Sequence, residues 1–117
     1  MTKVQFYRKD GAFYGFRETG HTGFGEEGDD ILCSALSAMT MFLLNTLEIA
    51  YHADFDYNID DKEAIITVTC KSALPENGAD SKVQFAASGL FEGYYYQLLD
   101  LTEEYYEFLS VEIVDQA

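Results

Sequence analysis

Residues 28–47, with the sequence GDDILCSALSAMTMFLLNTL, decide the fold of this chain. No charged residue occurs between Ile31 and Leu47, and the run is rich in apolar and small residues, which is typical of a helix packed in a core. Asp29 is the expected N-cap, and helical character continues to about Ala50. The run is short for a membrane span, and acidic residues flank it. We therefore expect a buried helix with Cys33 in its first turn, and no membrane association.

The segments on either side of this helix predict two β-hairpins, a second helix and a last strand. Asp10-Gly11 is a tight-turn pair, and the alternation of apolar with polar residues over 54–60 indicates a half-buried strand. Pro75 marks an expected exposed loop over 72–82. The expected strands are 4–9, 12–19, 54–60, 64–71 and 110–114, and the second helix carries the apolar stripe Leu90, Tyr94, Leu98, Leu101, Tyr105 and Phe108.

The predicted order, β-β-α-β-β-α-β, indicates an α+β fold with two layers. In this fold, two long helices cover one face of a mainly antiparallel sheet. A chain of 117 residues is long enough for one hydrophobic core and too short for two, so residues 1–117 are expected to form a single domain.

The charge of the chain restricts its partners. Seven Lys and Arg against 21 Asp and Glu give a formal net charge of −14, which argues against nucleic-acid binding through phosphate neutralisation. A basic partner fits this charge, and so does a role in solubility alone. Two cysteines without a signal-peptide pattern at the N-terminus favour the cytoplasm.

The second cysteine and the second histidine have simple structural interpretations. Cys70 lies in a predicted strand and is expected to be a small buried hydrophobe rather than a disulfide partner of Cys33. His52 follows the first helix, where it fits a C-terminal cap. No short-spaced pair of zinc ligands and no calcium-loop spacing occurs, so no metal or other cofactor is expected.

Glycines and tyrosines in the second predicted helix point to a second copy of the chain. Gly89 and Gly93 stand four residues apart, and each costs roughly 1 kcal/mol relative to Ala in a helix. Close approach of another helix would explain them. The helix also carries more tyrosine rings than one core can bury. We therefore expect a homodimer.

His21 and Cys33 are the candidate catalytic residues. Backbone N–H groups in the first turn of a helix favour a thiolate and would stabilise an oxyanion. Cys33 would be the nucleophile, and His21 would act first as base and then as acid. The acidic residues between them, such as Glu26 and Glu27, work against a thiolate.

Asp30 and Ser37 are the candidate supporting residues. They stand three residues before and four residues after Cys33, so a helix places all three on about the same side. Asp30 would orient His21, or it interacts only with the helix dipole. Ser37 would bond the sulfur, or it bonds only the carbonyl one turn back.

The segments Gly20-His21-Thr22-Gly23-Phe24 and GDDILCSALS (28–37) together resemble the signature of the bacterial ribosomal-processing cysteine proteases. The resemblance implies a small α+β homodimer that removes a short N-terminal extension from the twenty-seventh protein of the large ribosomal subunit. Cleavage would follow an aromatic pair and precede a small residue. His21 and Cys33 match the catalytic pair of the family, and Asp30 and Ser37 match two further motif positions.

The segment after the first hairpin is the expected substrate loop, formed by Gly20, Thr22, Gly23, Phe24 and Gly25. Its glycines fit a lid that folds over the peptide, and they fit a static turn equally well. Thr22 and Gly25 depart from the family pattern. The exact substrate preference of this chain therefore does not follow from the resemblance. The alternative function is a noncatalytic acidic module that binds basic ribosomal peptides, with Cys33 merely packed.

Overall fold

The computed structural model describes residues 1–20 and 27–116, without the side chains of residues 27–30. Its strands are β1 (Thr2–Lys9), β2 (Ala12–Thr19), β3 (Phe55–Asp60), β4 (Ile65–Cys70) and β5 (Leu109–Gln116), and its long helices are α1 (Glu27–Asn45) and α2 (Ser81–Tyr105). A π-helical segment, η1 (Thr46–Ala50), extends α1, and two 3₁₀ turns, η2 (Lys71–Ala73) and η3 (Pro75–Asn77), lead from β4 to α2. The predicted order of strands and long helices is confirmed.

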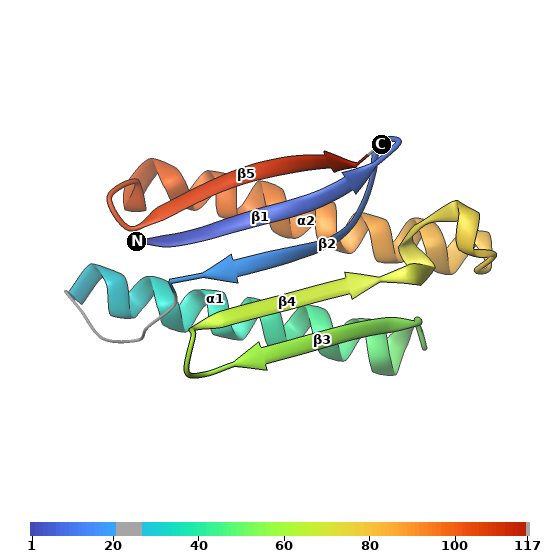
Figure 1. Cartoon of the computed structure of the whole chain (residues 1–117), viewed down its shortest axis with the longest axis horizontal. Helices are drawn as coiled ribbons and strands as arrows, with labels where there is room; N and C mark the ends of the chain where they lie inside the picture. The colour runs from blue at the N-terminus through green and yellow to red at the C-terminus, as the bar shows by residue number, and fades with distance from the viewer. Residues whose placement is uncertain (21–26, 117) are drawn as a thin grey trace.

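The strands form one mixed sheet in the order β3-β4-β2-β1-β5. Neighbouring strands are antiparallel except β1 and β5, which are parallel. Both helices lie on one face of the sheet, α1 behind β3 and β4 and α2 behind the other strands (Figure 1). This arrangement confirms the predicted two-layer α+β fold. The end of β2 and the beginning of α1 lie at the same end of the molecule (Figure 1).

The first hairpin turns at the predicted pair. Asp10 and Gly11 have φ angles of 50° and 82°, as a two-residue type I′ turn requires at both central positions. Lys9 and Ala12 pair on either side of the turn.

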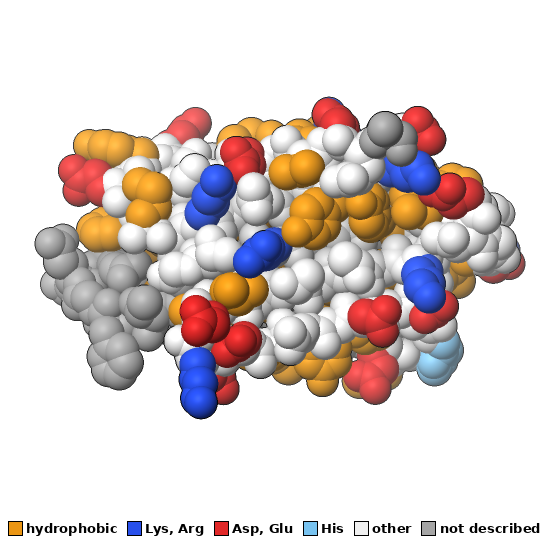
Figure 2. Space-filling view, viewed as in Figure 1, with side chains coloured by type: hydrophobic (Ala, Val, Ile, Leu, Met, Phe, Trp, Pro, Cys, Tyr) orange, Lys and Arg blue, Asp and Glu red, His pale blue; other side chains and the backbone are white. Residues whose placement is uncertain are grey.

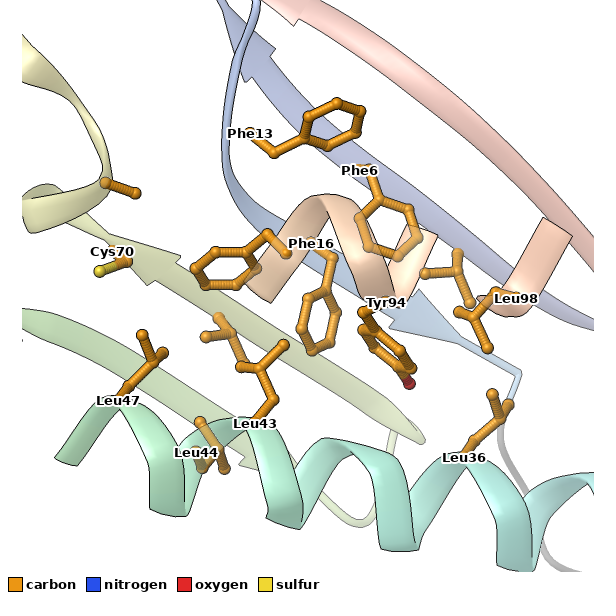
Figure 3. Close-up of a cluster of buried hydrophobic side chains, with 14 of the residues drawn as sticks. Phe6, Phe13, Phe16, Leu36, Leu43, Leu44, Leu47, Cys70, Tyr94 and Leu98 are labelled. Carbon is orange, nitrogen blue, oxygen red and sulfur yellow. The ribbon is translucent and has the colours of Figure 1, made fainter. Parts of the chain in front are cut away.

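The core lies between the inner face of the sheet and the two helices. Phe6, Phe16 and Tyr94 meet there, with ring centroids 5.2 to 5.8 Å apart (Figure 3). Helix α1 and its extension η1 contribute five buried leucines, and each such side chain stabilises the fold by about 1.5–3 kcal/mol relative to exposure. The buried leucines of α1 and η1 are Leu32, Leu36, Leu43, Leu44 and Leu47.

Helix α1 is a core helix with one exposed apolar side. The segment Ile31–Ala50 is long and apolar enough to cross a membrane, and it is the one such helix in the described part of the chain. A core helix passes the same test, and the inward leucines give it that role here. Phe42 and Ile49 on its other side are 65% and 69% exposed.

Three expectations from the sequence are wrong. Strand β3 is not half-buried, because it lies at the sheet edge and leaves Tyr57 and Ile59 58% and 44% exposed. The segment after β4 is not simply an exposed loop, because Ser72 in η2 is buried and its Oγ accepts a 2.8 Å hydrogen bond from the Asp54 amide. Helix α1 begins at Glu27, so Asp29 lies inside the helix and is not its N-cap.

Candidate active site

Cys33 lies in the second turn of α1, not in the first turn as predicted. The helix begins at Glu27, which makes Cys33 its seventh residue. The acidic residues of the first turn explain the earlier start, because carboxylates near a helix N-terminus interact favourably with the helix dipole. Only the first four N–H groups lack partners within a helix, so the amide of Cys33 is not one of them. The helix terminus therefore contributes less to a thiolate at Cys33 than the sequence suggested.

Neither cysteine forms a disulfide bond, and both are buried. Cys33 is 5% exposed and Cys70 is 1% exposed. Cys70 lies in the core cluster, where burial raises the pKa of its thiol above the ordinary value. The interpretation of Cys70 as a small buried hydrophobe is thus confirmed, and the thiol form is its stable state at neutral pH.

The helix places Asp30 and Ser37 on the same side as Cys33. All three belong to α1, three and four residues apart, which is about one turn in each direction. Ser37 is exposed, whereas Cys33 is buried. The side chain of Asp30 lies outside the described part of the structure, so its role as an orienting carboxylate stays a prediction.

Gly20 fixes the path of the chain before His21. Its φ angle is +80°, in the left-handed region that favours glycine. A Cβ at this position would stand 2.3 Å from the carbonyl oxygen of Met1 and would clash with it. Glycine is therefore required here by conformation and by space. His21, Thr22, Gly23, Phe24 and Gly25 lie outside the described residues, and their expected roles stay predictions.

A buried polar cluster next to this helix is the feature that the sequence reasoning missed. It consists of Glu18 in β2, Thr40 in α1 and Tyr94 in α2, each at most 6% exposed. The available signal was the period of two in β2, which places Glu18 on the same inward face as Phe16.

The electrostatics of the open sheet face show no single acidic patch. Figure 2 shows Asp and Glu side chains interspersed with Lys and Arg and with hydrophobic groups on this face. Several of the basic residues form ion pairs: Lys3 with Glu112 at 3.3 Å, Arg8 with Asp115 at 2.6 Å and Lys9 with Glu76 at 2.8 Å. Within residues 1–20 and 27–116, no cluster of His, Cys, Asp and Glu is suited to hold a metal ion.

Comparison with known proteins shows which solved structures this chain resembles. The structure resembles the crystal structure of SMU.848 from Streptococcus mutans, with 30% sequence identity, a TM-score of 0.80 and 99% of each chain covered. It also resembles the essential ribosomal processing protease Prp from S. aureus in complex with a substrate peptide, at 20% identity and a TM-score of 0.75 over 99% of this chain and 100% of that chain. The same protease with a covalently linked product peptide matches at 23% identity and a TM-score of 0.75 over 97% and 100%. A search of curated proteins found no match.

The family model described as cysteine protease Prp matches residues 1–110. The molecule is therefore a cysteine protease built on a two-layer α+β fold. The chain belongs to the cysteine protease Prp family. This membership favours the protease over the noncatalytic peptide-binding module.

Proposed function

We propose that this protein is a cytoplasmic cysteine endopeptidase that removes a short N-terminal extension from a large-subunit ribosomal protein, the twenty-seventh, after an aromatic pair. The observation that carries the proposal is a cysteine outside any disulfide, Cys33, on the core helix of a fold shared with a protease that was crystallised with a covalently linked product peptide. The whole chain, residues 1–117, acts as one protease domain in this proposal.

The chemistry assigned to the site uses His21 and Cys33. His21 accepts the proton of the Cys33 thiol, and the sulfur attacks the carbonyl carbon of the scissile peptide bond. The tetrahedral intermediate collapses to a thioester, and His21 gives its proton to the leaving amine. Water, deprotonated by His21, then attacks the thioester, which releases the carboxylate product and restores the thiol. All atoms come from the enzyme, the peptide and one water, so no cofactor takes part.

Asp30 and Ser37 support this pair in the proposal. Asp30 orients the imidazole of His21, and Ser37 donates a hydrogen bond to the sulfur. The segment from Gly20 to Gly25 contacts the peptide beside the scissile bond. The positive φ of Gly20 supports this assignment, because it sets the direction in which the chain leaves β2 towards His21.

The net charge supports a basic substrate. Ribosomal proteins are basic, and a chain with a formal charge of −14 attracts a basic tail over a distance of about one Debye length. The aromatic pair and the small residue that follows it come from the resemblance to the family, so they define the test peptide.

Cleavage of a synthetic peptide tests the function directly. The peptide contains an aromatic pair followed by alanine and lysines, and mass spectrometry identifies its products. We expect cleavage after the pair by the wild type and by Cys70→Ala, and none by Cys33→Ala. For the base, we expect His21→Asn to be inactive and His52→Asn, which changes the other histidine, to remain active. Binding without cleavage by the wild type would contradict the proposal.

We further propose that two copies of the chain associate through the helices. Gly89 and Gly93 have open space where a Cβ would stand, so the fold of one chain makes no use of their small size. They form the floor of a groove of about 260 Å³ between α1 and α2. Phe42 on this groove is 65% exposed, and Phe85 on the neighbouring turn of α2 is 80% exposed. A self-complementary contact would bury these rings in the groove of the partner.

Sedimentation of Gly93→Gln tests this contact. In a lone chain the substitution has room, and it should strengthen α2 by up to about 1 kcal/mol because Gly is a poor helix former. In a dimer the glutamine side chain would fill the groove that receives the aromatic rings of the partner. We expect the variant to sediment as a monomer with undiminished thermal stability at low concentration. A Gly93→Gln dimer as tight as the wild-type dimer would refute this interface.

A further inference from the structure

The buried cluster of Glu18, Thr40 and Tyr94 joins three elements of the fold. Glu18 is 0% exposed, Thr40 is 2% exposed and Tyr94 is 6% exposed. Most of the neighbouring core consists of apolar side chains. A carboxyl group in such a place costs free energy unless hydrogen bonds compensate it, so its partners determine what it does.

The hydrogen bonds of the cluster converge on one oxygen of Glu18. The hydroxyl of Tyr94 donates to Glu18 Oε1 at 2.5 Å, and the hydroxyl of Thr40 lies 3.3 Å from the same oxygen. Thr40 Oγ1 and the Tyr94 oxygen are 3.2 Å apart. Burial, and next the charge of Glu18, raise the pKa of Tyr94 well above its ordinary value, so its hydroxyl stays a donor at any physiological pH.

The aromatic core holds Tyr94 in place. Its ring packs edge-on against Phe6 at 5.6 Å and Phe16 at 5.2 Å between centroids. Figure 3 shows its hydroxyl oxygen pointing away from these rings and towards α1. The geometry of the Tyr94 hydroxyl is therefore set by rigid packing and not by the flexibility of a surface side chain.

The cluster connects the strand that precedes His21 to the helix that carries Cys33. Thr40 is seven residues after Cys33 in α1, close to two full turns, so both face the sheet from the same side of the helix. Glu18 is the second-last residue of β2, and His21 follows the end of that strand by two residues. The hydrogen bond between Glu18 and Thr40 thus joins the strand that leads to His21 to the helix that carries Cys33.

We propose that Glu18 is a positioning residue of the protease, which sets the register of α1 against β2 through Thr40 and Tyr94 and thereby places Cys33 relative to His21. This inference rests on the proposed function of the same pair. Stability alone does not account for the cluster, because replacing a buried polar network by apolar residues of similar size is often neutral or stabilising. A positioning role does account for the cluster. A hydrogen bond fixes the direction between its two groups, whereas apolar contacts allow a helix to slide along a strand.

The test separates placement from stability with an apolar replacement of the whole cluster. The triple variant Glu18→Leu, Thr40→Val, Tyr94→Phe replaces every polar side chain of the cluster by an apolar one of similar size. We expect its melting temperature to lie above that of the wild type or at most a few degrees below it. Its kcat should fall roughly 10- to 100-fold, the effect of misplacing reacting groups by about 1 Å, with KM changed much less. A triple variant with wild-type kcat would overturn the proposal.

Single variants make the assignment specific. Tyr94→Phe removes one hydroxyl and should lower kcat, whereas Tyr95→Phe, on the same helix and also packed on Phe6, should not. Glu18→Gln keeps an acceptor oxygen and should retain more activity than Glu18→Leu. Equal losses for Tyr94→Phe and Tyr95→Phe would contradict the role of the cluster.

A second readout needs no substrate and so distinguishes this inference from the proposed function. If the wild type cleaves no peptide, the proposed function fails, but the rate at which iodoacetamide modifies Cys33 still reports its environment. We expect the triple variant to alter that rate and its pH dependence by roughly tenfold or more, while Tyr95→Phe leaves both unchanged. Identical alkylation profiles for the wild type and the triple variant would overturn the inference by themselves.

Discussion

Replacing Gly20 by alanine should destabilise the fold and impair cleavage together. At φ +80° an alanine pays about 1–2 kcal/mol for the left-handed conformation. Its Cβ would also stand 2.3 Å from the Met1 carbonyl oxygen, which must move by roughly 1 Å to reach ordinary contact. Met1 precedes Thr2, whose amide donates a 2.7 Å hydrogen bond to the Phe108 carbonyl. Disturbing that bond adds about 1 kcal/mol, so the total loss should be about 2–3 kcal/mol.

Gly11→Ala is the matched control for this prediction. Gly11 has a φ of +82°, and nothing lies within 4 Å of a Cβ built on it, so alanine there pays the backbone cost alone. Urea unfolding should place Gly20→Ala below Gly11→Ala by about 1 kcal/mol. Peptide cleavage should fall in Gly20→Ala only, because Gly11 turns the hairpin and Gly20 directs the chain to His21. Equal free energies of unfolding for the two variants would refute the reasoning about the Met1 contact.

Three further predictions concern the rest of the fold. Phe16→Ala should lower the free energy of unfolding by about 3–5 kcal/mol in chemical denaturation, because the ring is fully buried among other rings. Ser72→Ala should cost about 1 kcal/mol in the same assay, since it removes the hydroxyl that accepts from the Asp54 amide. The hydrogen bond from Arg8 lowers the pKa of the Asp115 carboxyl, so the pair contributes stability above the ordinary pKa of 3.8 and loses it as pH falls through the lowered value. Arg8→Gln should therefore lower the melting temperature slightly at pH 7 and leave it unchanged in strong acid.

The sequence predicted those parts of the fold that local patterns control. The Asp10-Gly11 turn and the strand over 12–19 are correct to the residue, because turn chemistry and alternation are local properties. The burial of β3 was predicted wrongly, because alternation shows that a strand has two faces but not how completely a helix covers one of them. Tyr57 and Ile59 lie on an edge strand, and edge position depends on the whole sheet.

The site could be predicted as a list of residues but not as a geometry. The motif identified Cys33 and placed it on a helix, whereas the start of α1 was predicted three residues too late, with Asp29 as the N-cap and Asp30 as the first helical residue. Glycine at position 28 suggested a boundary, and the acidic first turn extended the helix past it. The partners of Glu18 come from residues 22 and 76 positions away in the chain, so no local pattern contained them.

The early start of α1 changes what must activate the nucleophile. The field of a helix terminus falls off within the first turn, and Cys33 lies in the second turn. Burial raises the pKa of the Cys70 thiol, and Cys70 has no assigned role in the chemistry, so it serves as the internal reference. In the proposed mechanism the imidazole of His21 favours the thiolate of Cys33, so its removal should slow the reaction of Cys33. In the wild type, we expect iodoacetamide at pH 7 to modify Cys33 much faster than Cys70, and in His21→Asn we expect the two rates to converge. A Cys33 that stays fast in His21→Asn would show that another group activates it, and the proposed division of roles between His21 and Cys33 would be wrong.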